Sequence, residues 1–322
     1  MEKEVFKVML LMALPASGKS EVRNFMANIE AERLKKDFHI GENLQLDDFP
    51  YVFMMRRIDE ELVKLNQPRM FYPGEEPFYD GRDWGTLCNL LNEDYHDLIN
   101  RTQIKVNSAA EYLFERIDRA SLAVGLKPRL DLLDESIRKK LAEALETEAQ
   151  ELINNKVSQY CDSLDGKTIV IEMARGGNDG ASMPLTGTFG YQYTLAQFCP
   201  EILKNAAILY IWVTPEESRR KNNEREDPND PGSNLNHKTP DSVMYYDYGC
   251  DDMQYLIETS EVKDTVTVKT HGQTYHLPIG VFDNRVDKTT TLRQSPDKWD
   301  SELVKELTEA INIVTNTMWK NY

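Results

Sequence analysis

The segment that most constrains this chain is Ala13–Ser20 (ALPASGKS), which lies between an apolar run and a helical pattern. The apolar run Val5–Ala13 has the length of a buried strand. The residues after the segment recur at helical spacing as Val22, Phe25, Met26 and Ile29. A Gly-Lys-Ser turn in a strand–loop–helix setting fits the pattern of a phosphate-binding loop, with Ala13 in place of the usual first glycine. The alternative is a surface turn that contains a glycine.

This pattern assigns a first group of residues to a nucleotide. Backbone N–H groups of such a loop and of the following helix point at the anion. Lys19 is expected to reach the β- and γ-phosphates of ATP, and the Ser20 hydroxyl is expected to be a ligand of Mg²⁺. The nucleotide-binding residues predicted here are Ala13, Pro15, Ala16, Ser17, Gly18, Lys19 and Ser20.

Short apolar runs predict the rest of the fold. Five segments are typical of buried strands: Val5–Ala13, Asn43–Asp47, Thr168–Ala174, Ala207–Thr214 and Pro278–Asp283. Near-continuous apolar runs favour parallel strands that are covered on both faces. Because helical patterns lie between most of them, the chain is expected to be an α/β protein with a doubly wound sheet. Residues 264–278 predict a hairpin, and a last helix is expected from Ser295.

A long helical segment separates the second and third expected strands. A crossover between parallel strands needs only about a dozen residues, so residues 50–165 are predicted to be a helical insertion. The remaining residues, 1–49 and 166–322, form the expected core, with a lid at about 215–260. The insertion has 15 basic and 22 acidic residues, and we expect it to bind the acceptor.

Charge restricts the partners. The formal net charge is −16, with 54 acidic and 38 basic side chains. This surface repels polyanions, so nucleic acid is disfavoured as a partner, whereas a few converging cations suffice for a small phosphorylated ligand. No apolar run approaches the roughly 20 residues of a membrane span. The four cysteines form no CxxC pair, which favours reduced thiols and a cytoplasmic protein. The oligomeric state is not specified by these patterns.

Three segments resemble those of P-loop kinases: LPASGKS, LQLDDF and IWVTPEESRRKNNER. The segment Leu46–Phe49 is similar to the uridine kinase, phosphoribulokinase and glycerate kinase branch. The segment Val281–Asn284 is similar to the zeta-toxin and polynucleotide-kinase branch. The resemblance implies a five-stranded parallel sheet of order 2-3-1-4-5, an acidic residue after the second strand, and a lid that carries arginines. The zeta-like branch has an arginine three positions after its aspartate, where this chain has Pro50 or Tyr51.

Acidic residues follow or end two of the expected strands. Asp47 and Asp48 lie at a strand's carboxyl end, where open α/β sheets bind ligands. Either carboxylate could accept the proton of the acceptor hydroxyl or hold Mg²⁺ through water, and we prefer Asp48. The alternative is an aspartate that caps a helix. Glu172 resembles the second carboxylate associated with Mg²⁺, and its alternative role is an ion pair with Arg175.

A further group of candidate site residues consists of the arginines after the fourth expected strand. Arg219, Arg220 and Arg225 resemble the lid arginines of nucleotide and sugar kinases, and guanidinium groups match phosphate with a planar fork of donors. Arg220 and Arg225 are expected to be catalytic, without a ranking between them, and Arg219 and Asn284 to contact the nucleotide. The alternative is a solvated helix face with ion pairs at helical spacing.

The residues leave several function classes open. The first is a kinase that moves the γ-phosphate of ATP to a hydroxyl or phosphate of a small molecule, nucleotide or sugar. The second is a P-loop ATPase without a phosphate acceptor; GTP is disfavoured because the guanine-reading tetrapeptide is absent after the fourth strand. The third is a nucleic-acid-end or toxin-type kinase, which the charge and the missing arginine disfavour. A non-enzymatic binding module remains the residual class.

Overall fold

The computed structural model describes residues 4–224 and 238–322, which form two compact units. The first unit contains Met1–Gln45, Leu164–Ala196 and Pro200–Tyr322, and the second contains Leu46–Ser163 and Gln197–Cys199. Asp47 and Asp48 therefore belong to the second unit, whereas the sequence analysis assigned them to the core. Arg225 and residues 226–237 of the expected lid lie outside the described residues.

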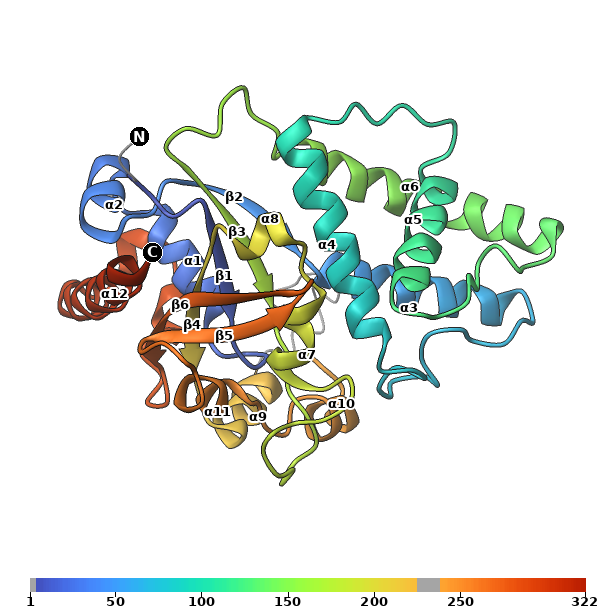
Figure 1. The fold of residues 1–322 in the computed structure, drawn as a ribbon. Helices are drawn as coiled ribbons and strands as arrows, with labels where there is room; N and C mark the ends of the chain where they lie inside the picture. Colours follow the sequence, from blue (N-terminus) through green and yellow to red (C-terminus); the bar gives the residue numbers. More distant parts are fainter. Residues whose placement is uncertain (1–3, 225–237) are drawn as a thin grey trace. The chain divides into compact units, whose positions relative to one another are not determined.

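Six strands form one mostly parallel sheet within the described residues, in the order β2-β3-β1-β4-β6-β5 (Figure 1). The strands are β1 (Val8–Met12), β2 (Glu42–Asp47), β3 (Lys167–Met173), β4 (Ala206–Trp212), β5 (Thr265–Thr270) and β6 (Gln273–Asp283). The chain is thus an α/β protein. The sheet has six strands where five were expected, because the predicted hairpin adds β5, which pairs antiparallel with β6 at the edge.

The predicted hairpin is present, and the predicted last helix begins later than expected. His271 and Gly272 both have positive φ angles (53° and 67°) and form the tight turn between β5 and β6. The last helix, α12, begins at Ser301 and not at Ser295. Asp300 caps it, because its Oδ1 accepts the N–H groups of Glu302 (2.8 Å) and Leu303 (3.0 Å).

Helices cover both faces of the sheet in the first unit. They are α1 (Lys19–Ala27), α2 (Ala31–Phe38), α7 (Gly190–Gln197), α8 (Pro200–Leu203), α9 (Pro215–Asn223), α10 (Asp241–Tyr246), α11 (Met253–Glu258) and α12 (Ser301–Asn321), with short 3₁₀ turns η1 (Thr290–Arg293) and η2 (Pro296–Lys298). Among the described residues, no helix combines the length and the apolar character that crossing a membrane requires.

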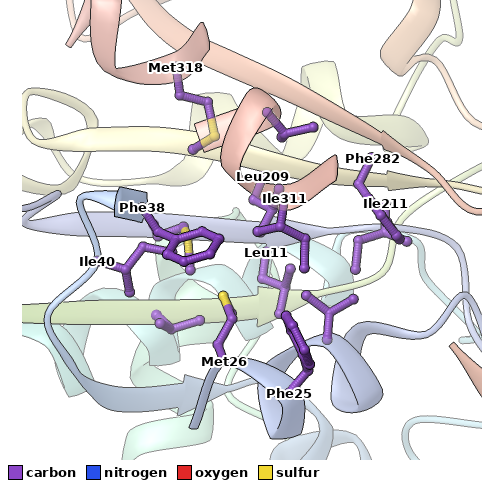
Figure 2. Close-up of a cluster of buried hydrophobic side chains, with 14 of the residues drawn as sticks. Leu11, Phe25, Met26, Phe38, Ile40, Leu209, Ile211, Phe282, Ile311 and Met318 are labelled. Carbon is purple, nitrogen blue, oxygen red and sulfur yellow. The ribbon is translucent and has the colours of Figure 1, made fainter. Parts of the chain in front are cut away.

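One apolar core lies between the sheet and the helices α1, α2 and α12, as Figure 2 shows. Alternate residues of the strands enter it, since successive side chains of a strand point to opposite faces. The helices contribute residues at spacings of three and four, the pattern of an amphipathic helix. The labelled members are Leu11, Phe25, Met26, Phe38, Ile40, Leu209, Ile211, Phe282, Ile311 and Met318. On the opposite face, Tyr191 of α7 packs edge-on against Tyr210 of β4.

The second unit consists of the helices α3 (Phe49–Lys64), α4 (Asp83–Asn100), α5 (Ala109–Ala123) and α6 (Glu135–Val157). A buried charged network crosses it. The Arg116 side chain is 1% exposed and contacts Asp94 (2.6 Å) and Glu93 (2.9 Å). Lys156 binds the same Asp94 carboxylate at 2.7 Å, and the Tyr51 hydroxyl donates to it at 2.6 Å. Each of these buried charges is therefore paired, as burial requires.

Candidate functional site

The loop between β1 and α1 has the backbone of an anion-binding nest. Ala16 and Gly18 both adopt left-handed conformations, with φ angles of 54° and 102°, on either side of Ser17. Such a conformation directs successive backbone N–H groups toward one anion. At the start of α1, the first N–H groups have no carbonyl within the helix to bond. A left-handed alanine costs roughly 1 kcal/mol, and strain of this kind gathers at functional sites.

Lys19 lies over this loop. The residue is 8% exposed, and its Nζ donates to the carbonyl oxygens of Ala13 (3.4 Å) and Leu14 (3.3 Å). Both bonds are longer than the usual 2.7–3.2 Å of an N–H···O bond. A phosphate oxygen would accept a shorter, charge-assisted bond from the same ammonium. An anion at the loop could therefore replace both contacts.

Three side chains distant in sequence fix the loop. Asn284, which is fully buried, donates from Nδ2 to the Ser17 carbonyl at 2.7 Å. The same Nδ2 lies 2.9 Å from the Thr289 hydroxyl. The Ser218 hydroxyl of α9 donates to the Pro15 carbonyl at 2.7 Å. Asn284 thus holds the backbone of the loop through the Ser17 carbonyl. Ser218 and Thr289 were missed by the sequence analysis, because no local pattern distinguishes them from other hydroxyl residues.

Gly18 is required by space as well as by conformation. A Cβ on Gly18 would lie 2.4 Å from the Thr289 hydroxyl oxygen and 2.9 Å from Asn284 Nδ2. Beside it, the Ser17 hydroxyl is buried and has no hydrogen-bond partner among the described residues. A buried hydroxyl of this kind normally has a partner. The tight glycine, the buried hydroxyl and the nest together fit a bound phosphate group.

Glu172 is paired with a residue that the sequence analysis did not consider. Its Oε2 accepts from Nη1 of Arg23 at 2.7 Å, and both side chains are largely buried. Arg23 lies one helical turn after Lys19 in α1, so this ion pair joins α1 to β3. Arg175, the alternative partner considered for Glu172, donates from Nη1 to the Ala174 carbonyl at 2.6 Å.

Two arginines of helix α9, Arg219 and Arg220, lie in different environments. The Arg219 guanidinium lies 4.6 Å from the centre of the Tyr245 ring and 3.5 Å from Asp179. Arg220 is about half exposed and pairs with Glu217 at 2.6 Å and Glu224 at 2.5 Å. Arg220 thus shows the ion pairs of a solvated helix face, which was the alternative considered for it.

The next residue of α9 was overlooked. The Lys221 side chain is 1% exposed and its Nζ lies 2.5 Å from Asp287 Oδ1. The pKa of Asp287 is lowered, since the hydrogen bonds from Lys221 and Thr290 outweigh the effect of burial. This pair fixes α9 to the segment after Asn284. It therefore helps to hold both supports of the loop, Ser218 and Asn284, in place.

The two aspartates of the second unit have different roles at the start of α3. Asp47 Oδ1 accepts the N–H of Phe49 at 2.9 Å, so it acts as the capping side chain. Asp48 is the residue that precedes the helix, is 6% exposed, and makes no capping bond to the N–H groups of α3. The capping alternative therefore applies to Asp47, which leaves the buried Asp48 as the better candidate for chemistry.

The glycines after Arg175 serve packing. Gly177 forms an isolated antiparallel bridge with Cys250, with N···O distances of 2.9 and 3.2 Å. A Cβ on Gly176 would lie 2.2 Å from the Cys250 carbonyl oxygen. These glycines allow two backbones to approach each other closely. The segment is thereby tied to the residues that precede α11.

A carboxyl pair lies beside that bridge. Asp251 Oδ2 accepts from the Tyr210 hydroxyl at 2.7 Å, and its Oδ1 accepts from the Met253 N–H at 2.9 Å. Asp252 instead accepts the N–H groups of Tyr191 (2.6 Å) and Gln192 (3.0 Å) at the start of α7. Burial, together with the neighbouring Asp252 charge, raises the pKa of Asp251 to about 6.

The described arrangement can hold a phosphate group at the loop and neutralise it with Lys19. It also offers the Ser20 hydroxyl and the Glu172 carboxylate as oxygen donors, the type of ligand that Mg²⁺ prefers. No family model, curated protein or solved structure matches the chain. The functional interpretation therefore depends on the residues themselves.

Proposed function

We propose that this chain is an ATP-dependent phosphotransferase, which moves the γ-phosphate to a hydroxyl or phosphate of a small molecule, nucleotide or sugar. The observation that carries the proposal is the Ala13–Ser20 loop, with its left-handed residues Ala16 and Gly18 and with Lys19 folded over it. A loop of this backbone and charge between a buried strand and a helix is suited to the phosphates of a nucleotide.

The residues of the loop would have different roles in binding the phosphates and Mg²⁺. N–H groups of Ala16–Ser20 would surround the phosphates, and Lys19 would exchange its carbonyl contacts for phosphate oxygens. The Ser20 hydroxyl and, through water, the Glu172 carboxylate would hold Mg²⁺. When bound, this ion neutralises charge that develops on the transferred group. Arg23, which already compensates Glu172, would keep that carboxylate oriented.

The fold supports the same proposal. The sheet order β2-β3-β1-β4-β6-β5 is compatible with a doubly wound P-loop core of order 2-3-1-4-5 to which the edge strand β5 has been added. The loop follows β1, which has β3 and β4 as its neighbours. Ligands of open α/β sheets bind at the carboxyl ends of such strands. The chain's resemblance to P-loop kinases is consistent with that placement.

Asp48 is the proposed proton acceptor. It is buried and does not cap α3, whereas Asp47 is used by the helix. A carboxylate that accepts the proton of an attacking hydroxyl increases its nucleophilicity in the transition state. Arg219 and Arg225 are the proposed lid arginines that contact the transferred phosphate. Arg220 is ranked below them because Glu217 and Glu224 already neutralise it.

The acceptor is proposed to be a small molecule. A formal net charge of −16 opposes the approach of a polyanion and favours a compact acceptor in an enclosed site. An ATPase without an acceptor uses the same loop, so the two functions differ in whether a phosphorylated product forms.

Calorimetric titration of ATP with Mg²⁺ tests the binding step. The full chain is compared with Lys19→Ala and with Lys36→Ala, which removes an exposed lysine of α2 in the same unit. Lys19→Ala is expected to weaken ATP binding at least about tenfold, the loss of one charge-assisted contact. Lys36→Ala is expected to bind as the unaltered chain does. Equal affinities for ATP in all three proteins would contradict the proposal.

A further inference from the structure

A cavity lies at the amino-terminal ends of the strands of the first unit. Its volume is about 660 Å³, and its walls come from the segments that precede β1, β3 and β4, from β6 and from the end of α12. The phosphate loop follows the opposite end of β1, whose five residues span about 16 Å at roughly 3.3 Å each. The cavity is therefore a separate site, and its volume is that of a small-molecule pocket.

Cations line this cavity in a strongly acidic protein. Its lysines are Lys7, Lys167 and Lys204. Lys167 is paired with Glu42 at 2.7 Å. Lys7 and Lys204 are exposed and form no ion pair with any residue that the structure describes. Two ammonium groups without carboxylate partners attract a counter-ion, most strongly one that bears two or more negative charges.

The acidic residues of the wall offset only part of this charge. Glu4 is bound to Lys35 at 2.6 Å, which leaves the exposed Asp165 carboxylate as one negative charge beside the two of Lys7 and Lys204. His276 is oriented by a hydrogen bond between its Nδ1 and the Thr267 hydroxyl at 3.1 Å. This bond fixes the imidazole in the wall and leaves Nε2 as its second polar atom.

The wall is also built rigidly. The Tyr322 hydroxyl accepts the Lys7 N–H at 2.8 Å and donates to the Asn205 carbonyl at 2.9 Å. Its ring stacks on Trp319, with centroids 5.4 Å apart. Tyr322 therefore joins the segments before β1 and β4, the two that carry the unpaired lysines. A preformed pocket loses less entropy when it binds a ligand.

We infer that this cavity binds a small multivalent anion, a metabolite with phosphate or carboxylate groups, through Lys7, Lys204 and His276. Lysine ammonium groups bind both kinds of oxyanion as point charges. The inference does not depend on nucleotide binding at the phosphate loop, because no residue is shared between the two sites.

Calorimetric titration with pyrophosphate, and separately with citrate, tests this inference. The starting protein is the full chain with Lys19→Ala, so that the phosphate loop contributes little to the signal. In this background, Lys7→Ala with Lys204→Ala removes the cavity cations. The control is Lys263→Ala with Lys298→Ala, which removes two exposed lysines that do not line the cavity and changes the net charge equally.

Saturable binding of at least one anion is expected, at least about tenfold weaker in the cavity variant and within about twofold in the control. The anion that binds more tightly identifies the chemistry of the ligand. Circular dichroism melts verify that the variants are folded, which the exposure of all four lysines leads us to expect. The inference is overturned if neither anion binds saturably up to millimolar concentration, or if the cavity variant and the control bind equally.

Discussion

At the scale of single residues, the phosphate loop depends on where the positive φ angles fall. Ala13 stands where the usual pattern has its first glycine, but Ala13 is not among the residues with positive φ; Ala16 and Gly18 are. Ala13 is instead fully buried directly after β1. The departure from the usual pattern is therefore conformationally harmless, whereas the glycine at position 18 is indispensable.

Gly18→Ala tests that conclusion. The new methyl group would meet Thr289 and Asn284 at less than 3.0 Å and would be held at a φ of 102°. Overpacking and left-handed strain together are expected to lower the free energy of unfolding by about 2–4 kcal/mol. Gly180→Ala is the control, since its φ is 72° but no atom lies within 4 Å of the added Cβ.

The control is expected to lose only about 1 kcal/mol, the cost of left-handed strain alone. Urea unfolding of the two variants measures the difference. Equal losses would contradict the close approach between Gly18 and Thr289.

The two adjacent aspartates permit a matched comparison of catalytic roles. Asp48→Asn is expected to lower kcat at least a hundredfold while ATP affinity changes little, because a general base acts in the transition state. Asp47→Asn keeps an oxygen that can accept the Phe49 N–H, so its kcat is expected to remain within a few-fold. Steady-state kinetics with the identified acceptor measures kcat for both variants. The reverse ranking would assign the chemistry to Asp47.

At the scale of secondary structure elements, buried charges hold helices together in the second unit. Arg116 of α5 contacts Glu93 and Asp94 of α4, and Asp94 is shared with Lys156 of α6. Arg119, one turn before the end of the same helix, binds the same Glu93 carboxylate at 2.7 Å, but its side chain is 59% exposed. The two arginines thus provide a buried and an exposed version of one ion pair.

Arg116→Met is expected to destabilise the protein by about 3–5 kcal/mol, because it leaves part of the buried negative charge without a partner. Arg119→Met is expected to cost at most about 1 kcal/mol, since an exposed pair contributes little. Urea unfolding followed by circular dichroism measures both changes. Similar losses for the two variants would show that burial of the network is not what stabilises α4, α5 and α6 against one another.

The carboxyl of Asp251, between β4 and α11, predicts a dependence of stability on pH. Its pKa is raised by burial to about 6, so the folded state binds a proton more tightly than the unfolded state. The contribution of this group to the free energy of unfolding is therefore greatest below about pH 4. It falls as the pH rises from about 4 to 6, by up to about 3 kcal/mol.

Asp251→Asn is expected to remove this loss, because the amide stays neutral and can still accept the Met253 N–H and donate to the Tyr210 hydroxyl. At pH 8 the variant is expected to be more stable than the unaltered chain, and at pH 4 about equally stable. Urea unfolding at both pH values tests this. An unchanged pH dependence in the variant would show that Asp251 is not the responsible group.

At the scale of the whole molecule, the sequence predicted what depends on local pattern. The buried strands, the hairpin and the helical character of the second unit follow from hydrophobic periodicity and turn residues. The contacts between distant segments did not follow. Ser218, Thr289 and Arg23 act on the loop or on Glu172 from positions that only the folded sheet brings together. Single-sequence periodicity contains no information on such pairs.

Boundaries were also predicted only approximately. The second unit begins at Leu46 and includes Gln197–Cys199, whereas composition indicated residues 50–165. The three residues 197–199 join it through Asn92 of α4, whose side chain bonds the Gln197 carbonyl (2.8 Å) and the Cys199 N–H (2.9 Å). A contact of this kind leaves no trace in composition.

The central claim is that phosphate passes from ATP to a small molecule. Mass spectrometry of a metabolite mixture incubated with the chain, ATP and Mg²⁺ tests it most directly, with Lys19→Ala and Lys36→Ala as parallel samples. The proposal predicts a product one phosphate heavier than its precursor, formed by the unaltered chain and by Lys36→Ala but not by Lys19→Ala. Release of inorganic phosphate without any phosphorylated product would contradict it and would identify an ATPase instead.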